Sequence, residues 1–199
     1  MTSSARFKSC MIASLAVFAG CGGFGRVNQG QVIEYKRGTG LVTVIGDSNY
    51  RDPVNPRFDV LPPVTIRTPE DPQEMGPEPE AGKLLRLDYG NRRAVVFDAS
   101  TQTLRTVAYM LISEQNDVSP ADARARHTRF PVVDRTRKTI TVYSPRDRKL
   151  VVFAVPEEYY ALPDDTWKAG DEVRYYYKDP GRALRFMNVS KTDLNKAGK

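Results

Sequence analysis

Apolar and polar positions alternate along much of the chain after residue 30. Val173, Tyr175 and Tyr177 occupy every second position of one such stretch, and Ile140 and Val142 do the same in another. A period of two is typical of strands in antiparallel sheets that bury one face and expose the other to water. The strands that this pattern predicts lie at 31–36, 41–47, 64–68, 83–89, 93–98, 104–112, 139–143, 150–155, 172–178 and 182–189.

Turn signals separate these strands, and helix signals are scarce. Gly90-Asn91-Arg92 is typical of a tight hairpin, and Asp179-Pro180-Gly181 favours another turn. One short helix is predicted at 119–126, where Ser119 can cap the first turn and Pro120 suits the first helical position. The sequence therefore predicts an all-β, antiparallel protein with at most one short helix near 119–126.

Two internal echoes indicate duplication, but at different spacings. The segment 81–86 resembles 169–174, whereas a rival alignment matches 95–104 with 141–150, and only one of the two can be the true period. We expect either two small OB-like barrels or one pseudo-duplicated β-barrel or sandwich. The expected organisation is a first β-unit at 30–113, a connector with the short helix at 114–128, a second, OB-like β-unit at 129–192 and a disordered tail at 193–199.

The N-terminus has the arrangement of a secretory signal. Arg6 and Lys8 precede a short apolar run at 11–18, which falls well short of the about 20 residues that cross a bilayer. The run ends in Phe18-Ala19-Gly20-Cys21, which resembles the lipobox of bacterial lipoproteins, with Phe18 where that family usually has Leu. The resemblance implies a signal peptide at 1–20, cleavage between Gly20 and Cys21, and lipidation of Cys21.

The same resemblance implies a location. Acyl chains on Cys21 would anchor the protein in a membrane, and the Gly-rich residues 21–29 would form a flexible tether. In lipoproteins of Gram-negative cells, Asp after the lipidated Cys signals retention in the inner membrane. Gly22 stands at that position here, which implies the outer membrane and a domain facing the periplasm. The alternative is a plain secreted protein cut near the same place.

The composition supports a packed core and excludes several kinds of site. Hydrophobic residues make up 40% of the 199, enough for one medium domain or two small ones. The two cysteines, Cys10 and Cys21, leave no disulfide for the mature domain, and His127 is the single histidine. Zinc, haem and iron–sulfur sites are therefore not expected. Because no catalytic motif is present either, we predict no enzymatic activity, no cofactor and no metal.

The net charge of +6 is concentrated in one part of the chain. Nine basic residues within 124–149 form a candidate site for an anionic partner, such as lipid head groups, lipopolysaccharide phosphates or an acidic protein. Alternatively these residues lie in solvated turns, or they pair with the acidic stretch 70–80 inside the molecule. The candidate residues are Arg124, Arg126, Arg129, Arg135, Arg137, Lys138, Arg146, Arg148 and Lys149.

Trp167, Tyr159 and Tyr160 are candidate aromatic contacts for a glycan or another ligand, since exposed rings on OB-like domains stack on sugars or bases. The alternative is that these rings belong to the core, as aromatic residues near strands usually do. A hydrolase remains an alternative, because the sequence contains many carboxylates and two of them could face a cleft about 5 to 10 Å apart. No nucleic acid partner is expected in the envelope.

The stretches 161–173 and 183–189 resemble a domain-of-unknown-function family of small lipoproteins from sulfate-reducing bacteria. That resemblance implies a setting and no activity. Combined with the lipobox, it predicts a lipid-anchored, non-enzymatic envelope protein that binds or helps to assemble another envelope protein, lipid or glycan. A glycan- or ligand-binding module is the first alternative, and a hydrolase is the second.

Overall fold

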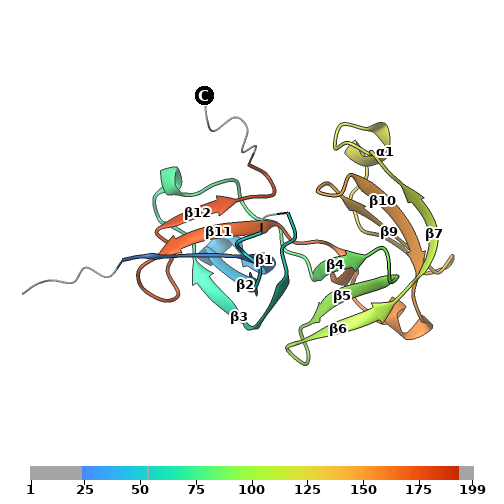
Figure 1. The fold of residues 1–199 in the computed structure, drawn as a ribbon, viewed down its shortest axis with the longest axis horizontal. Coiled ribbons are helices and arrows are strands. Elements are labelled where there is room, and N and C mark those ends of the chain that lie inside the picture. Colours follow the sequence, from blue (N-terminus) through green and yellow to red (C-terminus); the bar gives the residue numbers. More distant parts are fainter. Residues whose placement is uncertain (1–23, 53, 193–199) are drawn as a thin grey trace, which may run out of the picture.

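The computed structural model describes residues 24–52 and 54–192, whose strands form three antiparallel sheets (Figure 1). The strands are β1 (Arg26–Lys36), β2 (Leu41–Asp47), β3 (Phe58–Arg67), β4 (Leu84–Asp88), β5 (Arg93–Asp98), β6 (Thr103–Ala108), β7 (Met110–Gln115), β8 (Val132–Asp134), β9 (Thr139–Ser144), β10 (Lys149–Ala154), β11 (Glu172–Tyr177) and β12 (Arg185–Asn188). Their orders are β12-β11-β1-β2-β3, β4-β5-β6 and β7-β10-β9-β8. The prediction of an all-β, antiparallel protein is confirmed.

The five-stranded sheet joins the two ends of the described sequence. Strands β1, β2 and β3 share this sheet with β11 and β12, through the pairing of β1 with β11, while the residues between them build the other two sheets. We call 24–82 with 170–192 the terminal lobe and 83–169 the middle lobe; the two follow one another along the long axis (Figure 1). The strand pairing therefore does not follow the expected units 30–113 and 129–192. The expected units grouped strands that are neighbours in the sequence, whereas in the structure strands far apart in the sequence share one sheet.

The middle lobe contains a duplication, and its spacing is that of the rival alignment. Strands β4-β5-β6 and β8-β9-β10 are two meanders whose first turns begin at Asp88 and Asp134. In each, the carboxylate accepts a hydrogen bond from a turn N–H, that of Asn91 (2.9 Å) or of Arg137 (2.8 Å). Buried residues correspond at the same offset: Ala94 with Ile140, Val96 with Val142, and Val107 with Phe153. Within the described residues neither meander closes into a barrel, which agrees with a sandwich.

The other echo, 81–86 against 169–174, marks the two places where the chain crosses between the lobes. The crossings run side by side, with bridges from Lys83 and Leu84 to Ala169. A Cβ added to Gly170 would lie 1.9 Å from the Val32 carbonyl oxygen, and one added to Gly82 would lie 2.3 Å from that of Lys168. The repeated glycine therefore reflects close backbone approach at the crossing.

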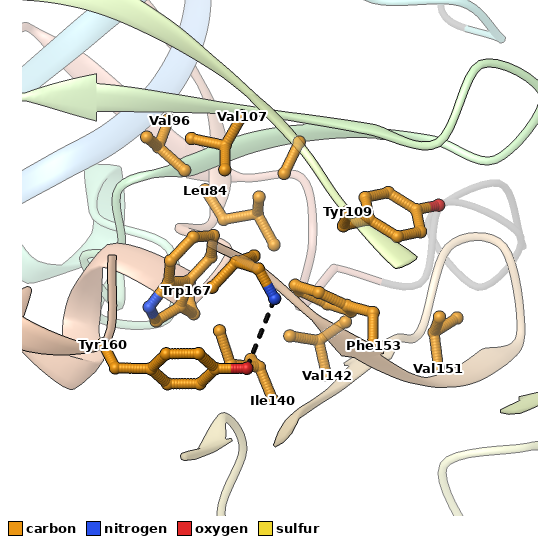
Figure 2. Close-up of a cluster of buried hydrophobic side chains, with 12 residues drawn as sticks. Leu84, Val96, Val107, Tyr109, Ile140, Val142, Val151, Phe153, Tyr160 and Trp167 are labelled. Atoms are coloured by element: carbon orange, nitrogen blue, oxygen red, sulfur yellow. Dashed lines mark hydrogen bonds between the residues drawn. The ribbon is translucent and has the colours of Figure 1, made fainter. Parts of the chain in front are cut away.

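Apolar contacts continue across the junction of the lobes. Ile33 and Ile45 of the terminal lobe pack with Leu85 and Phe97 of the middle lobe. Each lobe also has a core of its own. The larger one lies between the two sheets of the middle lobe and includes Trp167 (Figure 2).

Local details differ from the sequence predictions in three places. The short helix, α1 (Ala123–Arg126), is confirmed, but Asp122 caps it in place of Ser119, accepting the Arg124 N–H at 2.9 Å. The expected strand 104–112 is divided into β6 and β7, which belong to different sheets. The expected tether 21–29 ends earlier, because β1 already begins at Arg26. The predicted signal peptide 1–20 with its cleavage site at Gly20, the predicted lipidation site Cys21 and the predicted disordered tail 193–199 lie outside the described residues.

Substitution of Gly170 by Ala tests the crossing. We expect Gly170→Ala to destabilise the protein by about 1–3 kcal/mol or more, because the added methyl group overlaps a backbone oxygen that cannot move independently of β1. Urea unfolding of the full chain measures this. Gly38→Ala is the matched control, since no atom lies within 4 Å of a Cβ there, and it should change stability by no more than about 0.5 kcal/mol. Equal stability of the two variants would contradict a tight crossing.

Candidate functional site

Most of the predicted basic segment is neutralised within the chain. Six of its nine residues form ion pairs with carboxylates, none of which belongs to the acidic stretch 70–80. The hypothesis that the two segments pair with each other is therefore wrong. The observed pairs are Arg124 with Asp122, Arg135 with Asp164, Arg137 with Asp134, Lys138 with Glu157, Arg146 with Glu172, and Lys149 with Glu114.

Three basic residues of the segment remain exposed, and among the described residues they have no carboxylate partner: Arg126, Arg129 and Arg148. We call them the distal basic patch. The segments that carry them pack together, because the Val118 N–H donates to the Arg148 carbonyl oxygen (2.8 Å) and the Tyr143 hydroxyl donates to that of Val118 (3.0 Å). A small core of Val118, Ala125, Leu150 and their neighbours lies beneath. The patch thus rests on an ordered part of the middle lobe.

The acidic stretch 70–80 lies along the terminal lobe, and we call it the acidic strap. Its backbone follows β12, where the Gly76 N–H donates to the Phe186 carbonyl oxygen at 2.8 Å. Each glutamate of the strap has a basic partner in or beside the terminal lobe. The pairs are Glu70 with Arg182, Glu74 with Arg185, Glu78 with Arg37, and Glu80 with Lys168 and Lys191.

Glu80 is the most strongly held of these carboxylates. Its oxygens accept hydrogen bonds from the Nζ atoms of Lys168 (2.8 Å) and Lys191 (2.9 Å). These bonds, that of Lys168 first, lower the pKa of Glu80 to about 2. Because the pKa is lower in the folded than in the unfolded chain, the resulting stability is present above about pH 4.5. It is lost as the pH falls toward 2.

Glu80→Gln should therefore flatten the acid limb of the stability profile. Between pH 4.5 and 2 the wild-type protein should lose more stability than this variant, by less than about 1 kcal/mol because the pair is half exposed and screened by solvent. Urea unfolding at a series of pH values measures the difference. Glu158→Gln serves as control, since Glu158 is exposed. If both variants followed the wild-type profile, Glu80 would not be held as described.

The candidate aromatic contacts lie largely inside the middle lobe (Figure 2). Trp167 is 1% exposed and meets Phe153 edge-on, with ring centroids 6.0 Å apart. Tyr160 is also buried, and its hydroxyl accepts the Val155 N–H at 3.2 Å. Tyr159 packs against the same core and is half-buried. Neither Trp167 nor Tyr160 offers a face on which a sugar could stack, so burial favours the core interpretation.

A polar network with Gln29 and Asp47 buried at its centre lies at the junction of the lobes, and the sequence pattern did not indicate it. The Gln29 Nε2 donates to the carboxylates of both Asp47 (3.1 Å) and Glu172 (2.7 Å), and its Oε1 accepts from Arg174 (2.7 Å). Arg146, from the β9–β10 turn of the middle lobe, donates to the second Glu172 oxygen at 2.8 Å. Burial raises the pKa of Glu172, and the charge of Arg146 opposes that shift. The alternation of polar and apolar residues could not indicate this network, because polar residues at every second position of a strand are also what a solvent-exposed sheet face contains.

The carboxylates of Asp47 and Glu172 connect parts of the molecule through hydrogen bonds to internal donors. The other Asp47 oxygen accepts the N–H groups of Asn49 (2.8 Å) and Arg57 (2.7 Å), so both of its oxygens have internal donors. Two surface depressions lie elsewhere, and each contains a single carboxylate, Asp59 in one and Asp98 in the other. Neither has the paired acids that the hydrolase alternative requires.

Two further searches cover the same ranges of the chain. No group of three or more His, Cys, Asp or Glu residues in 24–52 and 54–192 is placed to hold a metal ion. In that part of the chain no helix is long and apolar enough to cross a membrane.

Comparison with known proteins places the chain in a family. Residues 23–197 match the model described as Domain of unknown function (DUF4881), so the chain belongs to that family. Neither a curated protein nor a solved structure matches it. The family membership agrees with the resemblance to an uncharacterised domain and adds no activity.

Proposed function

We propose that this chain is a lipid-anchored cell-envelope protein that acts as a non-enzymatic binding or assembly module for another envelope component. The lipobox-like Phe18-Ala19-Gly20-Cys21 supports the anchor, and Gly22 favours the outer membrane with the domain facing the periplasm. The family match begins at residue 23, so the N-terminal segment precedes the shared domain. The resemblance to lipoproteins of sulfate-reducing bacteria supports the same setting.

The distal basic patch is the observation that carries the binding role. Its arginines are exposed, in a protein whose other charged residues are mostly paired. A cluster of positive charges without carboxylate partners attracts and orients an anionic partner. The patch belongs to the middle lobe, at α1 and the β9–β10 turn, whereas β1 begins in the terminal lobe (Figure 1). A surface on the lobe that does not carry the proposed anchor is better placed to reach a partner than to contact the membrane of that anchor. We therefore propose an acidic envelope protein as that partner.

Replacement of Cys21 tests the anchor. We expect Cys21→Ala to release the protein from membranes into the soluble fraction, because no acyl chain can then be attached. Fractionation of cells followed by detection of the tagged chain measures this. Continued membrane association of the variant would refute the lipid anchor.

The double substitution Arg126→Glu and Arg129→Glu tests the binding surface. Cross-linking of the tagged, lipidated chain in envelopes, capture and mass spectrometry should find one abundant partner with the wild-type protein. The double variant should capture about tenfold less, equivalent to about 1.4 kcal/mol of binding free energy.

The control makes the same charge change elsewhere on the middle lobe, at the exposed Arg86 and Arg93. Arg86→Glu with Arg93→Glu should leave capture unchanged. Equal losses in both double variants would show a general charge effect and refute the patch. Capture of no specific protein by the wild-type chain would refute a protein partner.

A further inference from the structure

Exposed apolar side chains gather around Tyr176 at one end of the terminal lobe. Val27 pairs directly with Tyr176 across β1 and β11, and it is 55% exposed. Leu184, 41% exposed, donates its N–H to the Tyr176 carbonyl oxygen at 2.8 Å. Gly25 lies against the Tyr176 ring, which a Cβ at this position would approach to 2.1 Å, and the preceding Phe24 is fully exposed. We call Phe24, Val27, Tyr176 and Leu184 the apolar end.

Basic side chains flank the apolar end. Arg26 precedes Val27, and Lys178 follows β11; both are exposed and have no carboxylate partner in the described part of the chain. The nearby acids of the strap are already paired, as Glu70 with Arg182 shows, which leaves Asp179 as the exposed acid of the same turn. Aromatic and aliphatic side chains next to Lys and Arg are typical of protein surfaces at a lipid–water interface.

The length of chain before this end identifies what covers it. Only Gly22 and Gly23 separate Cys21 from Phe24. Three peptide units span at most about 11 Å, so a lipid on Cys21 would hold Phe24 close to the membrane surface. A tether this short keeps the apolar end at high local concentration next to the bilayer.

We infer that the apolar end rests in the lipid–water interface of the membrane that holds the anchor. This inference rests on the proposed lipidation of Cys21. It gives the domain a fixed orientation. The terminal lobe contacts the leaflet through Phe24 and Val27, and the middle lobe follows on the side of the terminal lobe away from the start of β1 (Figure 1). One exposed Val or Leu would be ordinary on any protein surface. Here Val27 pairs directly with Tyr176, the backbone of Leu184 bonds to that of Tyr176, and the exposed Phe24 follows the proposed lipid attachment point closely.

Site-specific labelling of the full, lipidated chain tests the inference. The mature chain contains no cysteine besides Cys21, so a single introduced thiol can be labelled with an environment-sensitive fluorophore. Val27→Cys and Leu184→Cys place the label at the apolar end, and Ala123→Cys places it on an exposed position of α1 as the matched control. Each protein is reconstituted in vesicles of phosphatidylethanolamine and phosphatidylglycerol that carry nitroxide-labelled lipids, and quenching of the fluorophore is measured.

The labels at Val27 and Leu184 should be quenched several-fold more than the label at Ala123. Similar quenching at all three positions, in protein that floats with the vesicles and carries one label per chain, would overturn the inference and leave the lipid anchor standing. Two labels per chain, or failure to float, would show that Cys21 is free. That result would refute the proposed anchor, and with it the inference. Two positions at the apolar end keep the test decisive if one substitution disturbs β1.

Discussion

The close contact of two backbone segments at the crossing between the lobes holds the whole structure together. Val32 of β1 donates its N–H to Asp171 (2.9 Å) and accepts the Gly82 N–H (3.1 Å), so both crossings attach to the same residue of the same strand. Further along, the Leu84 N–H donates to Lys168 at 2.9 Å. Such bonds require the backbones to approach without side chains between them, which only glycine allows at positions 82 and 170.

Two other contacts keep the lobes in a fixed relation once the crossing has formed. Apolar residues such as Ile45 and Phe97 pack across the junction, and the network of Gln29, Glu172 and Arg146 links β1 and β11 to a turn of the middle lobe. Buried charges are costly unless they are paired and hydrogen-bonded, as they are in this network. The two lobes are thus held in a set orientation, which the proposed function requires.

Charge pairing decides which surfaces of this basic protein remain available. The acidic strap is held by basic residues of the terminal lobe and its neighbours, and most of the basic segment is held by acids close to it. Each surface pair contributes little to stability, but each removes a charge from the set that could attract a partner. Among the exposed cations without a carboxylate partner in the described residues are the distal basic patch of the middle lobe and the cations of the apolar end on the terminal lobe.

The sequence by itself determined the local structure of this protein. Alternation of apolar residues predicted most strands, and turn residues such as Asn91 and Pro180 indicated the hairpins, because both signals depend on neighbours a few positions away. The matching turns at Asp88 and Asp134 have the spacing at which 95–104 resembles 141–150 in the sequence.

Only the tertiary structure decided which strands share a sheet and which charged residues are free. The pairing of β1 with β11, the burial of Trp167 and the contact of Glu70 with Arg182 all join residues far apart in the sequence. Such contacts depend on which segments can approach each other once side-chain volumes and loop closure are satisfied together. Composition and the alternation of apolar residues contain no information on packing or loop closure. The same tyrosines and arginines were therefore compatible with a binding surface or with a structural role until the fold showed their positions.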